Sequence, residues 1–135
     1  MPRTSASKRI CRVLVVEDNS DIRDLLSDVF AAEGYHFAAV ASGAEMRQAI
    51  AKDPIDVVVI DVSLPGGEDG YSLAVHAADC GLGVVLVTGH HDHFERLEKS
   101  GHNYLLKPFP MKSLLEAVDR ALQKVKADCV VSAPR

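Results

Sequence analysis

The stretch that decides the fold is Ile55-Asp-Val-Val-Val-Ile-Asp61, followed by Val62-Ser-Leu-Pro65. The run Ile55–Ile60 is nearly continuous β-branched apolar sequence. Such a run is typical of a central parallel strand that helices cover on both faces. The stretch therefore predicts a buried central strand with an acidic residue, Asp61, at its carboxyl end.

Apolar runs of strand length and amphipathic runs of helical spacing alternate on both sides of this stretch. The other strands are expected at Arg12–Val16, Tyr35–Val40, Gly83–Val87 and Asn103–Leu106. The first helix is expected to begin after Asp18-Asn19-Ser20 and to end at Gly34. Its apolar face consists of Ile22, Leu25, Leu26, Val29 and Phe30. The other helices are expected at 44–52, 71–78 and 91–100 and after Pro110. Five β–α units imply right-handed crossovers. We therefore predict an α/β, doubly wound (βα)5 fold with a five-stranded parallel sheet.

The composition is that of an ordinary globular protein, with 47% hydrophobic and 25% charged residues among 135 and a formal net charge of −4. The length suits one domain, which we expect at residues 9–126 between flexible tails at 1–8 and 127–135. Nucleic-acid phosphates need clustered lysine and arginine, so a mildly acidic chain is a poor general binder of them. Neither a membrane span of roughly 20 apolar residues nor a signal peptide is evident.

The cysteines, Cys11, Cys80 and Cys129, are odd in number and scattered along the chain. This pattern argues against a disulfide framework and fits a reducing cytosol, and the lack of a CxxC pair argues against a thiolate zinc site. We therefore expect a cytoplasmic protein whose cysteines are small buried or tail residues.

Polar side chains stand at the carboxyl ends of the predicted strands. Glu17 and Asp18 follow the first strand, Asp61 the third, Thr88 the fourth and Lys107 the fifth. Ligands of open parallel sheets bind outside these ends, where the strand order reverses. Carboxylates that meet there repel one another unless a cation neutralises them, and an all-oxygen ligand set suits Mg²⁺. The sequence therefore predicts an acidic metal site, with an ammonium and a hydroxyl at its rim, that suits an incoming phosphoryl group.

Four motifs in this order resemble the receiver domains of two-component signalling. They are Val-Leu-Val-Val-Glu-Asp-Asn at 13–19, Val-Val-Val-Ile-Asp-Val-Ser-Leu-Pro at 57–65, Val-Leu-Val-Thr-Gly at 85–89 and Tyr-Leu-Leu-Lys-Pro-Phe at 104–109. The resemblance covers residues 9–126 and implies the flavodoxin-like form of this fold, with strand order 2-1-3-4-5. It implies a stand-alone response regulator that takes a phosphoryl group from a phosphohistidine and catalyses only its own phosphotransfer and dephosphorylation, so it is not an enzyme in the usual sense.

The resemblance also implies the residues that hold the metal and the phosphoryl group. Asp61 would be the phosphoacceptor and a metal ligand. Asp18 would bind Mg²⁺, or Mn²⁺ in its place, directly, and Glu17 would bind it through a water. The backbone carbonyl of Ser63 would be a further ligand.

Three further residues would complete the machinery of such a domain. Thr88 and Lys107 would each contact a phosphoryl oxygen. Tyr104 would be the aromatic switch that turns inward when Thr88 moves. The Lys107–Pro108 peptide bond would be cis, an isomer that only X–Pro bonds adopt at small cost.

The implied partners are a sensor histidine kinase or a histidine phosphotransfer protein as phosphodonor, together with a downstream target protein. Neither direct nucleic-acid binding nor membrane binding is expected. Action in a relay, as a phosphate sink or by docking to a target stays open at this point.

Three alternatives compete with this interpretation. A degenerate receiver that binds partners without phosphorylation is disfavoured by the intact set of Asp18, Asp61, Thr88 and Lys107. A phosphatase of the haloacid dehalogenase type needs a second aspartate two residues after its nucleophile, where this chain has Ser63. A flavodoxin-like cofactor carrier needs a phosphate-cradling loop after the first strand, where Glu17 and Asp18 would repel a phosphate.

Two segments depart from the common pattern of the family. The loop at 65–70 is one residue longer than usual, and the span from Thr88 to Lys107 is about one helical turn shorter. The fourth helix is therefore expected to be short, frayed or irregular. His90, His91 and His93 in this span are interpreted as solvated loop residues, with His90 placed to influence the lifetime of the phosphoryl group.

Overall fold

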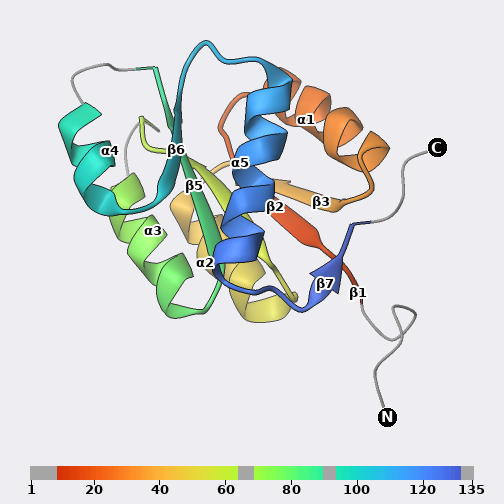
Figure 1. The fold of residues 1–135 in the computed structure, drawn as a ribbon. Coiled ribbons are helices and arrows are strands. Elements are labelled where there is room, and N and C mark those ends of the chain that lie inside the picture. The colour runs from red at the N-terminus through yellow and green to blue at the C-terminus, as the bar shows by residue number, and fades with distance from the viewer. Residues whose placement is uncertain (1–8, 64–68, 90–93, 132–135) are drawn as a thin grey trace.

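The stretch Val57–Asp61 forms β4, the central strand of a five-stranded parallel sheet (Figure 1). All five of its residues are buried, as the apolar run predicts. The structure is a computed structural model and describes residues 9–63, 69–89 and 94–131. The expected N-terminal tail, most of the long loop after Asp61 and the three histidines at 90, 91 and 93 lie outside these residues.

The strand order in the sheet is β3-β2-β4-β5-β6. Strand β2 spans Arg12–Val16, β3 spans His36–Val40, β5 spans Gly83–Thr88 and β6 spans Asn103–Leu106. Every neighbouring pair in this sheet is parallel. Counted along the chain, these five strands have the predicted order 2-1-3-4-5, so the flavodoxin-like fold is confirmed. The strand order reverses at β2, because β3 lies on one side of it and β4 lies on the other.

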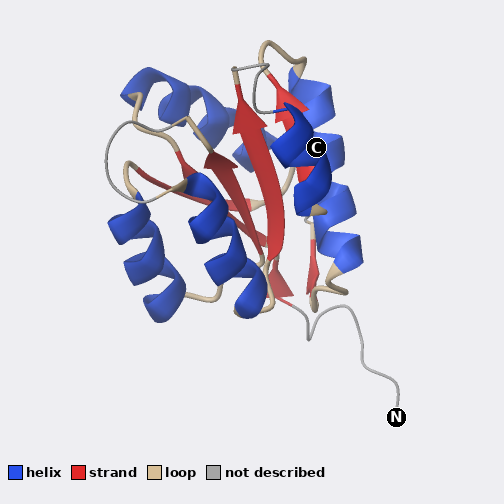
Figure 2. Cartoon of the chain, turned by 90° about the vertical axis from the view of Figure 1, so that its left-hand side faces the viewer, coloured by secondary structure: helices blue, strands red, loops and turns tan. Residues whose placement is uncertain are grey.

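Helices lie on both sides of the sheet (Figure 2). They are α1 (Ser20–Ala32), α2 (Gly43–Lys52), α3 (Gly70–Asp79), α4 (Phe94–Ser100) and α5 (Met111–Lys124). Side chains alternate between the two faces along each strand, so the core forms two layers. Phe30 of α1 and Leu114 of α5 pack on Val57 and Val59 of β4. Helices α2, α3 and α4 pack on the opposite side chains, Val58 and Ile60 among them.

Helix α1 begins where the sequence predicts. The Asn19 side chain accepts a hydrogen bond from the backbone N–H of Ile22 at 3.1 Å and so caps the helix. The predicted apolar face is narrower than expected, however. Leu26 is buried, whereas Ile22 and Leu25 are 37% and 54% exposed. Hydrophobic periodicity does not distinguish the buried residue from the two exposed ones, because it does not indicate which part of the apolar face the sheet covers.

Helix α5 lies unusually close to β5. A Cβ atom at Gly83 would come within 2.9 Å of the backbone oxygen of Ala121, so a glycine is needed at this position. Helix α4 contains seven residues, which agrees with the expected short fourth helix. Within the described ranges no helix has both the length and the apolar character that a membrane span requires.

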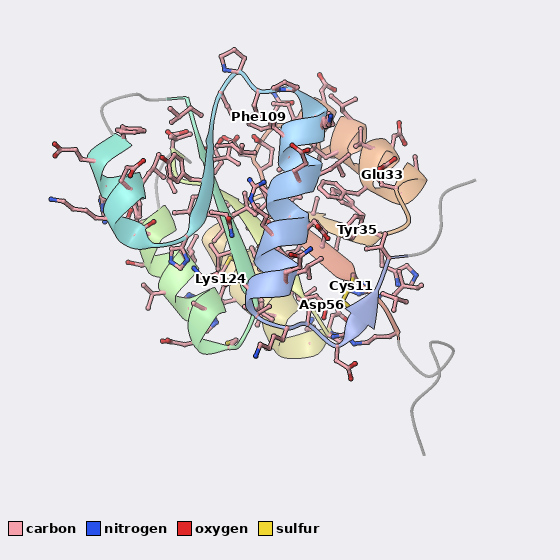
Figure 3. The ribbon with its side chains drawn as sticks, in the orientation of Figure 1. Cys11, Glu33, Tyr35, Asp56, Phe109 and Lys124 are labelled. Atoms are coloured by element: carbon pink, nitrogen blue, oxygen red, sulfur yellow. A yellow bond between two sulfur atoms is a disulfide. The ribbon has the colours of Figure 1, made fainter. Side chains whose placement is uncertain are left out.

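The two ends of the described chain differ from expectation. Strand β1 (Arg9–Ile10) pairs in parallel with β7 (Cys129–Val130), where a flexible tail was predicted from residue 127 onward. Cys11 and Cys129 form a disulfide (Figure 3). The expectation that these cysteines are free is therefore wrong, and Cys80 is free and exposed. Cys11 and Cys129 are 118 residues apart in sequence, and only the folded sheet brings them together.

Candidate functional site

Four polar residues meet at the carboxyl ends of the sheet strands. Glu17 directly follows β2, Asp61 is the last residue of β4, Thr88 is the last residue of β5, and Lys107 directly follows β6. Glu17, Asp61 and Thr88 are buried, with 6%, 8% and 0% of their surfaces exposed. The structure thus gathers the strand-end residues around the point where the strand order reverses, as expected for this fold.

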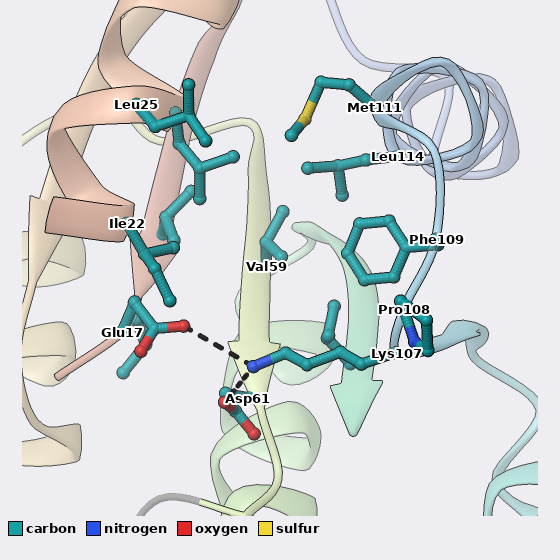
Figure 4. A pocket seen from close by; sticks show the side chains of 14 residues that line it. Glu17, Ile22, Leu25, Val59, Asp61, Lys107, Pro108, Phe109, Met111 and Leu114 are labelled. Carbon is teal, nitrogen blue, oxygen red and sulfur yellow. Dashed lines mark hydrogen bonds and ion pairs between the residues drawn. The ribbon is translucent and has the colours of Figure 1, made fainter. Parts of the chain in front are cut away.

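Asp61 is held by hydrogen bonds to both of its carboxylate oxygens. Its Oδ2 accepts one from Lys107 Nζ at 2.9 Å (Figure 4). Its Oδ1 accepts two from Ser63, one from the backbone N–H at 2.9 Å and one from the hydroxyl at 2.5 Å. Three donors therefore fix the orientation of this carboxylate at the end of the central strand.

These contacts set the ionisation of Asp61. Burial is the largest single influence and raises the pKa of Asp61, because it penalises the charged form. The Ser63 hydroxyl, the Lys107 ammonium and the Ser63 amide together outweigh burial, so the pKa of Asp61 lies below its ordinary value. The carboxylate is ionised at neutral pH and available as a nucleophile.

Glu17 shares the Lys107 ammonium with Asp61. Its Oε1 lies 3.8 Å from Lys107 Nζ, and its Oε2 accepts a hydrogen bond from the Asn19 amide at 3.2 Å. Burial raises the pKa of Glu17, and these two favourable contacts do not offset that effect. For Lys107, burial lowers the pKa, but the hydrogen bond to Asp61 and the nearby acidic charges raise it above the ordinary value.

The acidic side chains of the site offer only oxygen atoms as ligands, and oxygen ligands suit a hard cation. Asp18 lies on the exposed side of the site. Among the described residues, carboxylate oxygens of Glu17, Asp18 and Asp61 do not all lie within 4.8 Å of one another; the group that meets this distance is Cys11, Asp56 and Cys129, at the other end of the sheet. The Lys107 ammonium lies between Glu17 and Asp61 and bridges them.

Thr88 and Tyr104 lie beside the site on neighbouring strands. The Thr88 carbonyl accepts a hydrogen bond from the Lys107 amide at 2.8 Å, which joins the ends of β5 and β6. The Tyr104 hydroxyl donates a hydrogen bond to Glu98 of α4, and its ring meets Phe94 edge-on at 6.2 Å. The Lys107–Pro108 peptide bond is cis, the isomer that the sequence analysis expects.

An apolar cavity of about 300 Å³ opens beside Asp61 and Lys107, between α1 and α5 (Figure 4). Ile22 and Leu25 line it from α1, and Phe109 lines it from the segment before α5. The sequence analysis missed this cavity, because it assigned Ile22 and Leu25 to the buried face of the helix. Their place in the first two turns, next to Glu17 and Asp18, is the signal that could have pointed to it.

The match to a known family agrees with this geometry. Residues 13–119, most of the chain, match the family model described as the response regulator receiver domain. The chain belongs to this family. Its receiver domain therefore comprises the five-stranded sheet and the helices that cover it, and the match leaves out β1 and β7.

Curated relatives of this receiver domain include two transcriptional regulatory proteins. YbdJ of Bacillus subtilis (strain 168) is 37% identical over an alignment of 108 positions that covers 77% of this chain and 47% of YbdJ. TorR of Escherichia coli O157:H7, the TorCAD operon regulator, is 31% identical over an alignment of 117 positions that covers 84% of this chain and 50% of TorR. The chain thus spans about half the length of these relatives.

Solved structures of other receiver domains superpose closely on this one. The receiver domain of the Francisella response regulator 1452 has a TM-score of 0.73 at 27% identity, over 84% of this chain and 98% of that one. The response regulator TrrA of Thermotoga maritima, solved in complex with Mg²⁺-BeF, has a TM-score of 0.74 at 27% identity, over 84% of this chain and all of that one.

Proposed function

We propose that this receiver domain accepts a phosphoryl group on Asp61 from the phosphohistidine of a sensor histidine kinase or a histidine phosphotransfer protein. The observation that carries the proposal is the 2.9 Å hydrogen bond from Lys107 Nζ to Asp61 Oδ2 at the end of the buried central strand. It gives an ionised carboxylate of fixed orientation a neighbouring ammonium that can balance the charge of an arriving phosphoryl group.

The transfer is a displacement at phosphorus. One carboxylate oxygen of Asp61 forms a bond to the phosphorus, and the bond between phosphorus and the donor imidazole breaks, so that its electron pair stays on the imidazole nitrogen. Asp61 needs no general base because it is already ionised. Phosphoryl transfer depends mainly on positioning and charge stabilisation. Ser63 and Lys107 supply the positioning, and Lys107 supplies part of the charge.

The donor set fits Mg²⁺, because it consists of carboxylate and carbonyl oxygens without sulfur. Asp18, Asp61 and the backbone carbonyl of Ser63 would hold the ion directly, and Glu17 would hold it through a water, with Mn²⁺ as an alternative metal. Such an ion supplies positive charge that relieves the repulsion between the acidic residues and the phosphoryl oxygens. The Mg²⁺-BeF complex of the TrrA protein supports this part of the proposal.

The signal would pass from the phosphoryl group to the surface through Thr88 and Tyr104. Thr88 is fully buried at the end of β5 and would turn its hydroxyl to a phosphoryl oxygen. Tyr104, on the neighbouring strand β6, would then leave Glu98 and turn inward. We propose that the domain signals by docking to another protein, because a net charge of −4 does not favour direct contact with nucleic acid. We also propose that it works in the cytoplasm.

Intact-protein mass spectrometry after incubation with acetyl phosphate tests the proposal. A gain of one phosphoryl mass is expected in the presence of Mg²⁺, and it should vanish on chelation and in Asp61→Asn. Asp79→Asn is the matched control, since Asp79 is an exposed aspartate at the end of α3, and it should label like the wild type.

A different result would favour a docking protein that is not phosphorylated. The proposal is wrong if the wild type gains no mass while a known receiver domain labels under the same conditions, and if beryllofluoride also fails to bind. If beryllofluoride binds without detectable labelling, the phosphoryl group is lost too fast to trap, and the acceptor role stands.

A further inference from the structure

The disulfide lies at the end of the sheet opposite to Asp61. Cys11 comes immediately before β2, and Asp56 comes immediately before β4. These are the two strands whose other ends carry Glu17 and Asp61. Strands β1 and β7 and the Cys11–Cys129 disulfide together form a small structure at this end, which we call the clasp (Figure 3).

The N-terminal side of the clasp is anchored without the disulfide. The Asp56 carboxylate is buried, with 4% of its side chain exposed, and accepts hydrogen bonds from both terminal nitrogens of Arg9. It accepts a third from the Arg12 amide at 2.7 Å. The Cys11 carbonyl also accepts a hydrogen bond from the His36 amide at 2.9 Å. Strand β1 is thus tied to β4 and β3 directly.

Strand β7 depends far more on the disulfide. It contains two residues and pairs only with β1, and the Cys11 amide donates to the Val130 carbonyl at 2.8 Å. A two-stranded pairing of this length is marginal in water. Without the covalent bond, β7 would be held by this pairing, by the attraction between Asp128 and Arg9 and by the packing of Ala127 and Cys129 on the core, so we expect β7 to leave more readily than β1.

A metal site is the competing use of the same residues. Sulfur atoms of Cys11 and Cys129 and a carboxylate oxygen of Asp56 lie within 4.8 Å of one another. The Asp56 oxygens, however, are already engaged by Arg9 and by the Arg12 amide, and a cation there would sit against the Arg9 guanidinium. The geometry favours a bond between the two sulfurs over a metal held by all three side chains.

The disulfide can be reached from outside on one side. Cys11 is 3% exposed, whereas Cys129 is half-buried. A cavity of about 200 Å³ borders both cysteines, and Lys126 and Gln123 line it as well. An incoming thiolate would therefore meet Cys129 first, near the positive charge of Lys126.

We propose that the Cys11–Cys129 disulfide is a redox-operated clasp that a dithiol reductant opens, releasing residues 127–131 while the receiver domain stays folded. One thiolate of the reductant attacks Cys129 Sγ and forms a mixed disulfide, and Cys11 leaves as a thiolate. The second thiol of the reductant then displaces Cys129. The dithiol is oxidised to a disulfide, and the two cysteines gain two electrons and two protons.

The position of the two cysteines supports a switching role over a purely structural one. The family match covers residues 13–119, so both cysteines lie outside the range that matches the family, although Cys11 itself is buried in the core. Opening the clasp would uncover Leu122 and Tyr35, because Val131 lies beside each of them in a surface cavity.

The test uses the full chain in a Cys80→Ser background, so that the clasp holds the only cysteines. The oxidised protein is treated with dithiothreitol without denaturant, freed thiols are alkylated and counted by mass spectrometry, and amide hydrogen exchange is followed. Two alkylations are expected, together with exchange at least about tenfold faster at residues 127–131 and unchanged protection in β4. Cys129→Ser should show the same fast exchange without reductant. None of these readouts depends on phosphorylation, so they are independent of the proposed phosphoacceptor function.

Three outcomes would overturn the proposal. Reduction that requires denaturant would make the disulfide purely structural. Faster exchange throughout β4 on reduction would show that the whole domain loosens, not a clasp. Stoichiometric Zn²⁺ binding by the reduced protein that Asp56→Asn abolishes would identify a metal site in place of the clasp.

Discussion

The Lys107 ammonium lies 2.9 Å from Oδ2 of Asp61, and together with the two Ser63 donors it keeps the carboxylate ionised and in a fixed orientation. It forms because β4 and β6 end at the same edge of the sheet, with β5 between them. The sequence between these residues includes two helices, yet the parallel topology brings their side chains into direct contact. Lys107 is 36% exposed on its side chain, so it can also meet a group that arrives from solvent.

Replacing Lys107 with methionine should slow the labelling of Asp61. The substitution keeps an unbranched side chain and removes the charge that balances the incoming phosphoryl oxygens. Loss of one such donor typically costs about 10²–10³ in rate. The rate is measured as mass gain from acetyl phosphate over time in the presence of Mg²⁺. Lys112→Met, at an exposed lysine of α5, is the control and should label at the normal rate. Equal rates in both variants would remove Lys107 from the mechanism.

The same substitution should change how stability depends on pH. Because the pKa of Asp61 is lowered in the folded state, its contribution to stability is complete above its ordinary value of 3.8 and is lost as the pH falls through the folded-state value. Lys107→Met should therefore destabilise the protein at neutral pH, by about 1 kcal/mol after allowing for solvent screening of the lysine. The difference from the wild type in urea denaturation should shrink below pH 3.8.

Glu17→Gln should have the opposite effect on stability. Burial raises the pKa of Glu17, so the ionised side chain costs stability at neutral pH. A glutamine of similar shape removes this cost, and we expect a gain of about 1 kcal/mol, or roughly 3 °C in the melting temperature. The gain should be complete above the folded-state pKa of Glu17 and vanish below the ordinary value of 4.5.

Thermal denaturation at several pH values checks this prediction. Glu116→Gln, at an exposed glutamate of α5, is the matched control and should leave the melting temperature nearly unchanged. A loss of stability in Glu17→Gln at neutral pH would mean that the contacts of Glu17 with Lys107 and Asn19 outweigh its burial. Although more stable, the variant should also bind Mg²⁺ more weakly, because it lacks one of the proposed carboxylates.

The strand ends could be predicted from sequence because a parallel sheet brings together whatever follows its strands. Asp61, Thr88 and Lys107 each stand where an apolar run stops, and that position alone determines which edge of the sheet they occupy. The Ser63 hydroxyl that bonds Asp61 could not be found in this way. Its direction depends on the local course of the loop, which apolar periodicity does not describe.

The clasp could not be predicted for a different reason. Cys11 and Cys129 meet because the chain after α5 returns to the amino ends of β2 and β4. No periodic pattern marks a strand of two residues, and β7 is paired only with another strand of the same length. Cysteine counting also favoured free thiols, since three cysteines cannot all pair. The contact of Tyr104 with Glu98 was missed as well, because it depends on how the short helix α4 lies against β6.

That contact leads to the last prediction, for Glu98→Ala. The hydrogen bond to Glu98 is the main reason why the pKa of Tyr104 is raised, and it ties the Tyr104 hydroxyl to helix α4. Its removal should lower the pKa of Tyr104 toward the ordinary value of 10.0. If this contact opposes the phosphorylated state, the variant should also label faster, by about two- to fivefold.

Carbon-13 NMR of the tyrosine rings follows the titration, and mass gain from acetyl phosphate follows the labelling. Glu95→Ala, at an exposed glutamate of the same helix, should change neither quantity. A lowered pKa of Tyr104 with an unchanged labelling rate would separate the ring from the phosphoacceptor, and Tyr104 would then be a surface residue of β6 and not a switch. A change in both, absent from Glu95→Ala, would identify Glu98 as the residue that holds the domain in its unphosphorylated conformation, because the substitution removes the hydrogen bond that Tyr104 donates to helix α4.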